Sequence, residues 1–125
     1  MKDFSEITED RIIYKSKYYF IIKDGYPVSP GHLLIISKAV RKDFFELSFH
    51  EKNELPSIID EAKKLIETEY NPDGYNIGMN CGASAGQTVF HFHCHVIPRY
   101  IGDMENPRGG VRHCVSGKGH YLAIR

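Results

Sequence analysis

The chain has 125 residues, a length that fits one domain and that buries about two thirds of its unfolded surface on folding. Its 16 basic and 16 acidic side chains balance, which argues against a broad electrostatic surface for long nucleic acid but not against a small charged ligand. Residues 1–6 carry charges where a secretory signal needs an apolar run, and no stretch approaches the roughly 18 apolar residues of a membrane span. We therefore expect a cytoplasmic protein with no membrane partner.

The cysteines predict neither a disulfide framework nor a thiolate zinc site. Cys81, Cys94 and Cys114 are odd in number and lack the Cys-x-x-Cys spacing of such sites. Cys94 lies between two histidines and is expected to pack inward as a small hydrophobic residue.

The first third of the chain predicts three strands. Residues 11–15 and 18–23 are rich in Ile, Tyr and Phe and are expected to form a hairpin with a tight turn between them. Residues 24–31 are dense in turn formers, and the apolar run of residues 33–36 predicts a buried third strand. His32 then lies where the loop meets this strand.

One long amphipathic helix is predicted from Ser48 to about Tyr70. Ser48 and Glu51 fit a capping box, and apolar residues recur behind them at helical spacing. Pro56 lies inside this stretch and is expected to kink the helix, unless the helix proper begins near Pro56 with the proline in its first turn.

Two more strands and a tail are predicted after the helix. Residues 75–80 and 89–97 are expected to form a second hairpin, joined by a loop of small residues. From about residue 102 the chain is rich in Gly, Pro and Arg and loses periodicity, which indicates an irregular tail that must dock to be ordered. We interpret residues 1–125 as one domain.

His91, His93 and His95 alternate with apolar residues in the last predicted strand. In an extended strand these three rings project from one face, while the apolar side chains between them point to the other. Three imidazoles are a poor filling for a sheet face because buried neutral rings still need hydrogen-bond partners. The pattern therefore predicts a site, with metal binding and catalysis both open.

The loop just before the histidines, Gly82 to Thr88, consists of small and polar residues. Its backbone can come close to a ligand and present several N–H groups, which suits a phosphate. Alone it is equally compatible with a plain turn. Its position against three histidines favours the phosphate site.

The run from Asn80 to Ile97 resembles the signature of the histidine triad nucleotide-binding proteins, His-φ-His-φ-His-φ-φ with φ apolar. Pro30-Gly31-His32 is similar to a second motif of that family, and the tail around Arg108 and Arg112 resembles bacterial members related to fragile histidine triad hydrolases. The resemblance implies an α+β fold with a five-stranded antiparallel sheet and one long helix. It also implies a homodimer whose sheets join.

The resemblance further implies a role for each histidine. His93 is expected to attack the α-phosphorus of a nucleotide and form a nucleotidyl-histidine, with its tautomer set by the backbone carbonyl of His91. His95 is expected beside the phosphate and the bridging oxygen, stabilising charge as a protonated ring. His91 and His32 are expected to hold the triplet in place, although His32 could instead be a surface residue.

Five further positions are expected to bind substrate. Gly86, Gln87 and Thr88 would hold the non-bridging oxygens, and Asn80 would add a polar contact or simply end a strand. Asp24 would accept hydrogen bonds from the ribose hydroxyls, or would only form a turn.

The leading hypothesis is a nucleotide hydrolase that cleaves at an α-phosphate in two displacements and requires no cofactor. Diadenosine polyphosphates, nucleoside phosphoramidates and adenylylated compounds are the candidate substrates, each with a purine nucleotide. The apolar residues among positions 4–22 could include a purine pocket, but most are expected to be core, and alternation alone does not identify which face inward. The alternatives are a phosphorylase or nucleotidyltransferase, a nucleotide-binding regulator, and a metal site with His32 as fourth ligand. Transferase branches of the superfamily carry Gln at the position of His95.

Overall fold

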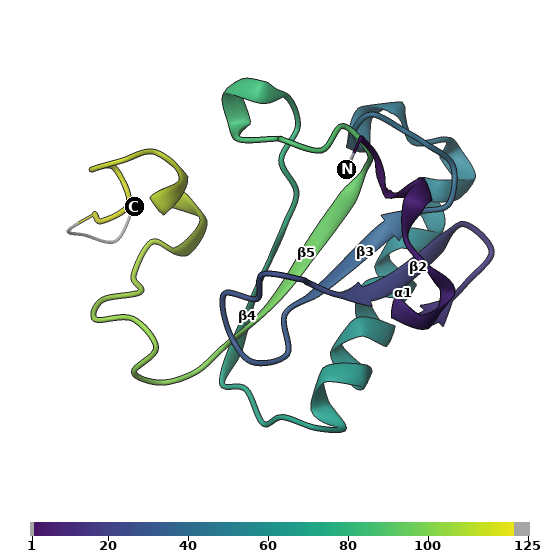
Figure 1. Cartoon of the computed structure of the whole chain (residues 1–125). Coiled ribbons are helices and arrows are strands. Elements are labelled where there is room, and N and C mark those ends of the chain that lie inside the picture. The colour runs from purple at the N-terminus through teal and green to yellow at the C-terminus, as the bar shows by residue number, and fades with distance from the viewer. Residues whose placement is uncertain (1, 122–125) are drawn as a thin grey trace.

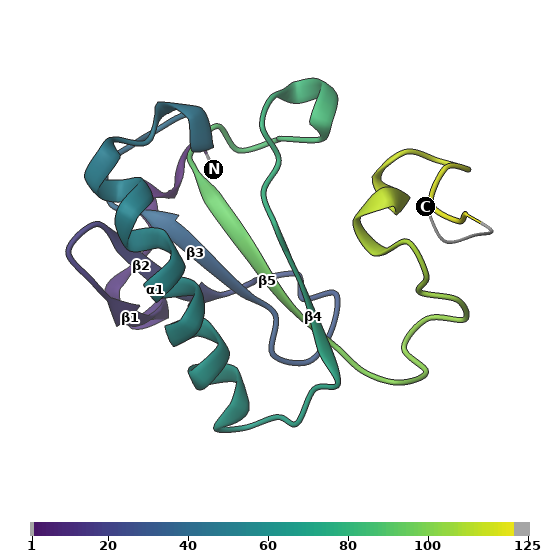
Figure 2. The same cartoon turned by 180° about the vertical axis from the view of Figure 1, so that it is seen from behind.

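The computed structural model describes residues 2–121. The main elements are β1 Ile12–Lys15, β2 Tyr19–Lys23, β3 Leu33–Ser37, α1 Phe49–Glu67, β4 Gly74–Gly78 and β5 His93–Arg99. The strands form one antiparallel sheet in the order β1-β2-β3-β5-β4, and α1 covers one face of it (Figures 1 and 2). The predicted five-stranded sheet with one long helix is confirmed.

The capping box at the start of α1 forms as predicted. The Ser48 hydroxyl accepts from the backbone N–H of Glu51, and the Glu51 carboxylate accepts from the backbone N–H of Ser48. This exchange satisfies two backbone donors that a helix start leaves free. α1 begins at Phe49 and runs on past Pro56, so the alternative start near the proline is wrong, and the helix ends at Glu67 rather than near residue 70.

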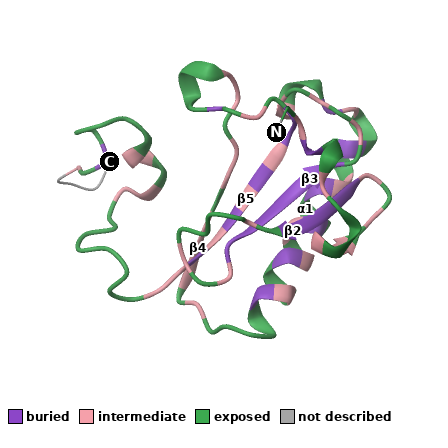
Figure 3. Ribbon diagram, viewed as in Figure 1, coloured by how far each residue is buried: buried purple, intermediate pink, exposed green. Residues whose placement is uncertain are grey.

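The main core lies between the sheet and α1. Alternate residues of the strands face the helix, and its buried side chains repeat at the spacing of one helical face. Figure 3 shows the buried residues concentrated in β2, β3 and β5. Cys94 is fully buried in this layer, as predicted, and burial raises the pKa of its thiol to about 12. The helix contributes Leu55, Ile58, Ala62 and Ile66, and the strands contribute Tyr19, Ile21, Leu33, Ile35, Cys94 and Val96.

A smaller apolar cluster lies on the opposite face of the sheet. Phe20 and Ile22 of β2 and Leu34 of β3 point to this side, and Phe4 from the N-terminal segment covers them. The sequence alone could not say which residues of β2 face which side. The face away from α1 is the one from which the histidines project.

The histidine strand differs from its prediction. β5 begins at His93 rather than at residue 89, so His91 lies in the approach to the strand. The N–H of Phe92 donates to the carbonyl of Arg41, after β3, at 2.6 Å. The carbonyl of Phe92 accepts from the N–H of Ser37, the last residue of β3, at 3.4 Å. β4 and β5 are antiparallel neighbours, but the segment between them contains a 3-10 helix at Ala83–Ala85, so the connection is not a tight hairpin.

The tail contains no strand or α-helix among the residues described after β5. It has a 3-10 helix at Gly110–Cys114 and stands beyond β4 (Figure 1). It folds back closely on itself: Gly109 has a φ of 95°, and a Cβ there would lie 2.0 Å from the carbonyl oxygen of Gly119. No helix within residues 2–121 combines the length and the apolar character needed to cross a membrane.

Core packing behind the histidines makes a first prediction. Phe92 is 1% exposed and packs against Tyr19, whereas Phe45 is 73% exposed. Phe92→Ala should lower the free energy of unfolding by about 3–5 kcal/mol because it removes buried apolar surface and leaves a cavity. Phe45→Ala should change it by less than about 0.5 kcal/mol. Urea melts of both variants measure this, and equal stability of the two would contradict the assigned core.

Candidate active site

The pairing of β3 with β5 brings the histidines together. His93 lies opposite Ile36 and His95 opposite Leu34, so His32, just before β3, comes next to His95. The ring centres of His93 and His95 are 5.4 Å apart, and those of His32 and His95 are 5.1 Å apart. His32 therefore lies against the triplet, and its role there stays a prediction.

His91 is fully buried and links three segments. Its Nδ1 accepts from the backbone N–H of Phe4 at 3.0 Å, and its Nε2 donates to the carbonyl of Ser37 at 2.7 Å. Both ring nitrogens are therefore used inside the protein. His91 ties the N-terminal segment to the end of β3, which agrees with its predicted role of holding the triplet in place.

His93 has one bonded ring nitrogen, and its other nitrogen has no hydrogen-bond partner among residues 2–121. Its Nδ1 donates to the carbonyl of His91 at 2.8 Å, as expected from the sequence. The proton therefore lies on Nδ1, and Nε2 keeps its lone pair. Burial lowers the pKa of His93, so the ring is neutral near pH 7. The Phe4 ring packs edge-on against it, with the ring centres 5.0 Å apart.

The tautomers of His32 and His95 follow from a chain of hydrogen bonds. The backbone N–H of Val28 donates to His32 Nδ1 at 3.2 Å, so the ring proton of neutral His32 lies on Nε2. This Nε2 lies 2.9 Å from His95 Nδ1 and donates to it. Neutral His95 therefore carries its own proton on Nε2.

His95 is neutral, which differs from the protonated ring expected from the sequence. Burial, together with the neighbouring His93 and His32, lowers its pKa to about 4, and the Asp24 carboxylate opposes this decrease only in part. The ring therefore offers a neutral Nε2–H donor rather than a positive charge.

The turn between β2 and β3 positions His32. Gly31 has a φ of 92°, and a Cβ there would lie 2.9 Å from the Tyr70 ring, so the turn requires glycine. Ser29 donates to Pro98 O at 2.6 Å, which ties the turn to β5. His32 itself is 3% exposed, so the alternative of a surface histidine is wrong.

Asp24 lies at the start of the same turn. Its Oδ2 is 3.2 Å from His32 Nε2 and 3.8 Å from His95 Nδ1, and its Oδ1 accepts from the backbone N–H of Tyr26. The residue forms a turn and also faces the histidine pair. A contact with ribose stays a prediction.

One candidate metal site consists of Asp24, His32 and His95, because one donor atom from each lies within 4.8 Å of the others. A ligating histidine uses one nitrogen for the metal and donates a proton from the other. His32 instead accepts a hydrogen bond at Nδ1, which keeps the proton on Nε2, the atom that faces the group. These residues do not fit a metal ion.

The predicted phosphate loop has a different internal arrangement from the one expected. Gln87 is 4% exposed, its Oε1 accepts from Gly82 N, and its Nε2 donates to the carbonyls of Lys42 and Val89. The Gln87 amide thus holds the loop in shape, whereas the sequence assigned it to the phosphate. Thr88 is exposed and lies close to the histidines in the sequence. Its contact with phosphate stays a prediction.

A cleft of about 770 Å³ opens beside His95. One side consists of β4, β5 and the phosphate loop, including the predicted residues Asn80 and Gly86. The other side is the 3-10 helix of the tail. The tail residues that line it are Gly110, Val111, Cys114 and Val115.

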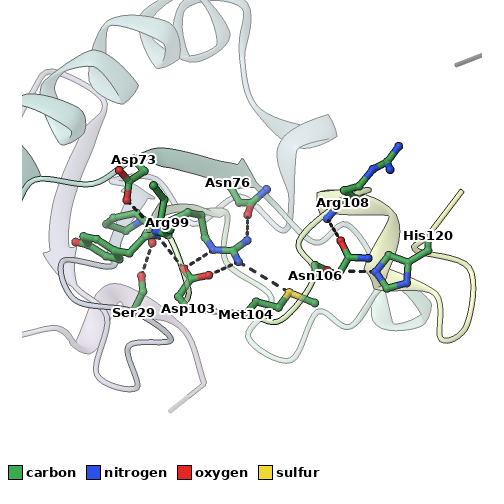
Figure 4. Close-up of polar contacts among 12 residues, drawn as sticks. Ser29, Asp73, Asn76, Arg99, Asp103, Met104, Asn106, Arg108 and His120 are labelled. Carbon is green, nitrogen blue, oxygen red and sulfur yellow. Dashed lines mark hydrogen bonds and ion pairs between the residues drawn. The ribbon is translucent and has the colours of Figure 1, made fainter. Parts of the chain in front are cut away.

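The tail is directed toward this cleft by contacts at the end of β5. Arg99 donates to Asn76 on β4 and pairs with Asp103 through two hydrogen bonds of 2.9 and 2.7 Å (Figure 4). These bonds lower the pKa of Asp103 to about 2. Arg112 donates to the carbonyls of Lys118 and Gly119, so its side chain is used within the tail. Figure 4 shows the Arg108 side chain directed away from this junction.

A family model for the HIT domain matches residues 5–102. The chain belongs to the HIT family. Among curated proteins, an AP-4-A phosphorylase of Mycobacterium tuberculosis is 32% identical over 96 residues, covering 76% of this chain and 49% of that protein. A bis(5'-adenosyl)-triphosphatase of Saccharomyces cerevisiae is 30% identical over 103 residues, covering 78% and 50%. The chain thus spans about half the length of these curated relatives.

Solved structures of the HIT family share this fold. A HIT family protein from Bacillus anthracis superposes with a TM-score of 0.69 at 31% identity, covering 91% of this chain and 71% of that one. The NitFhit protein of Caenorhabditis elegans gives a TM-score of 0.74 at 30% identity, covering 86% and 26%.

The HIT match contains every site residue predicted from the sequence and ends where the tail begins. Sequence reasoning missed two contributors. Phe4 contacts His91 and His93 from the far end of the chain, and the tail forms one wall of the cleft. No spacing rule connects Phe4 to a histidine 87 residues away. The glycines of the tail, among them Gly109 and Gly119, were the sign of a close backbone fold there.

The depressed pKa values predict how stability changes with pH. Burial lowers the pKa of His32, His93 and His95 in the folded protein, the last from 6.5 to about 4. Above pH 6.5 the His95 ring is neutral in both states, and its full contribution to stability is present. As the pH falls from 6.5 to about 4, the unfolded chain takes up protons first, so the free energy of unfolding decreases.

Urea melts between pH 4 and 7.5 measure this effect. His95→Asn should show a shallower decrease than the unmodified protein over the same range, because one of the three buried rings is gone. Identical slopes for the two proteins would show that His95 is not held neutral by the fold.

Proposed function

We propose that this HIT domain cleaves nucleotides at the α-phosphate through a covalent intermediate on His93. The observation that carries the proposal is the His93 ring itself: Nδ1 donates to the His91 carbonyl, which leaves the Nε2 lone pair available for attack. The cleft beside His95 supplies room for a substrate. Family membership supports the same chemistry.

Dinucleoside polyphosphates are the substrate class that the comparisons favour. Both curated relatives are named for diadenosine polyphosphates, one as an AP-4-A phosphorylase and one as a bis(5'-adenosyl)-triphosphatase. Adenylylated compounds and phosphoramidates share the α-phosphate and stay second candidates. The neutral His95 favours the anhydrides, because a leaving phosphate departs as an anion whereas an amine needs a proton.

The residues divide the first step among them. His93 Nε2 attacks the α-phosphorus, the bond to the leaving phosphate breaks, and its electron pair moves to the leaving oxygen. The His95 Nε2–H stabilises the charge on that oxygen. Thr88 and Asn80 hold the non-bridging oxygens. The N–H groups of Ala85, Gly86 and Gln87 donate within the loop, so the predicted backbone contact at Gly86 is not part of this proposal. His91 keeps the His93 tautomer correct by presenting its carbonyl, and Gln87 maintains the loop.

The nucleoside would lie on the face of the sheet away from α1. The Phe4 ring packs against His93, and Phe20 and Ile22 lie with Phe4 in the apolar cluster of that face, which suits a purine ring. We also propose a homodimer, because β4 is the terminal strand of the sheet and a terminal strand can pair with a second copy.

The second step transfers the nucleotidyl group from His93 to water or to inorganic phosphate. One curated relative is named as a phosphorylase, which supports phosphate as the acceptor. The other is named as a triphosphatase, which supports water. We propose water. Addition of phosphate should leave the mononucleotide as product, and a nucleoside diphosphate that grows with phosphate concentration would show phosphorolysis.

Removal of the His93 ring tests the proposed function. His93→Ala should lower turnover of diadenosine tri- and tetraphosphate by at least about 10³-fold, because the covalent route needs the ring nitrogen. His50→Ala, at an exposed histidine in the first turn of α1, is the matched control and should keep full activity. Protein quenched in denaturant at alkaline pH, where a phosphorus–nitrogen bond to histidine survives, should carry an added mononucleotide by mass spectrometry, on the unmodified protein and the control only.

Two results would contradict this proposal. Retained turnover in His93→Ala would remove His93 as the nucleophile. Loss of activity in EDTA, restored by a divalent cation, would show that a metal is required after all.

A further inference from the structure

The Asp24 carboxylate lies beside the hydrogen bond that joins His32 to His95. Its Oδ2 is 3.2 Å from His32 Nε2 and 3.8 Å from His95 Nδ1, so the charge flanks both ends of that bond. The Asp24 side chain is 13% exposed, and that of His32 is 2% exposed. With little water between them, the carboxylate acts on these nitrogens more strongly than it would at the surface.

The backbone of the turn holds the carboxylate in this position. The N–H of Tyr26 donates to Asp24 Oδ1 at 2.8 Å, and the N–H of Asp24 donates to His32 O at 3.0 Å. The N–H of Val28 fixes the His32 ring from the same turn. The carboxylate and the ring are therefore positioned together.

A role limited to ribose would leave this arrangement unexplained. Asp24 lines a cavity beside the turn, but its Oδ1 accepts from the turn backbone and its Oδ2 faces the two rings. The negative charge of Asp24 lies next to the His32 Nε2 proton, which forms the hydrogen bond to His95 Nδ1. Electrostatic attraction to the carboxylate therefore opposes loss of the His32 Nε2 proton. It also opposes any turn of the His32 ring that would move this proton away.

We propose that Asp24 is a positioning residue that acts through the histidine pair. Its charge keeps the His32 Nε2–H on His95 Nδ1, and His95 is thereby held with its own Nε2–H directed into the cleft. This inference rests on the proposed function, because it assigns Asp24 to the step in which the leaving group departs.

The chemistry of that step determines how the role can be measured. The P–O bond breaks, its electron pair moves to the leaving oxygen, and the His95 Nε2–H donates a hydrogen bond to that oxygen while keeping its proton. The bond matters most when the oxygen carries the most charge and attracts the proton most strongly. Loss of Asp24 should therefore affect a basic leaving group more than a weakly basic one.

Asp24→Asn removes the charge and keeps the shape of the side chain. The substrates are the phenyl and the p-nitrophenyl esters of AMP, each with an intact ribose and as the 2',3'-dideoxy analogue. Asp60→Asn, exposed on α1, is the matched control and should behave like the unmodified protein. Thermal melts confirm that both variants are folded.

The expected result has three parts. Asp24→Asn lowers kcat on the phenyl ester by about tenfold, as loss of part of the hydrogen-bond stabilisation of the leaving oxygen would. The loss is smaller on the p-nitrophenyl ester, because its leaving oxygen is less basic. Each loss is the same with and without the ribose hydroxyls, and KM changes little.

Other patterns would overturn the inference. A loss that disappears with the dideoxy substrates would assign Asp24 to the ribose. An equal loss on both esters would show a general structural defect. With the unmodified protein active, either pattern contradicts only the role of Asp24. No turnover of any ester by the unmodified protein would instead contradict the proposed function, and this role with it.

Discussion

The His91 ring is the constraint on which the rest of the site depends. Its Nδ1 accepts from Phe4 and its Nε2 donates to Ser37, so one buried side chain joins the N-terminal segment, β3 and the start of β5. With the ring fixed at both ends, its backbone carbonyl is fixed too, and that carbonyl takes the proton of His93 Nδ1. The nucleophile that we propose is thus prepared by the packing of the fold, without a separate base to activate it.

A second chain of hydrogen bonds prepares the other half of the site. It runs from the Val28 N–H through His32 to His95, with the Asp24 carboxylate beside it. His93 and His95 lie two residues apart on one strand, and both rings are neutral. Their tautomers differ: Nε2 carries a lone pair in His93 and a proton in His95. The difference arises from the partners of their Nδ1 atoms: a carbonyl for His93 and a ring N–H for His95.

The sequence predicted the parts of this site that depend on local pattern. Alternation placed His93 and His95 on one face of a strand, and the Pro30-Gly31-His32 motif placed His32 at the start of its neighbour. Contacts between distant segments were beyond such patterns. The bond from Phe4 to His91 spans nearly the whole chain, and the burial that lowers the pKa of His95 depends on three-dimensional packing. Gln87 was assigned to the phosphate because composition cannot show that its amide is used by the loop.

The most direct test of this account is the tautomer of each histidine, measured by long-range proton–nitrogen correlation NMR on ¹⁵N-labelled protein at pH 7. The account predicts a proton on Nδ1 of His93 and on Nε2 of His32, His91 and His95, with all four rings neutral. A proton on Nε2 of His93 would contradict it, since the attacking nitrogen would then have no lone pair. A doubly protonated His95 at pH 7 would contradict it as well.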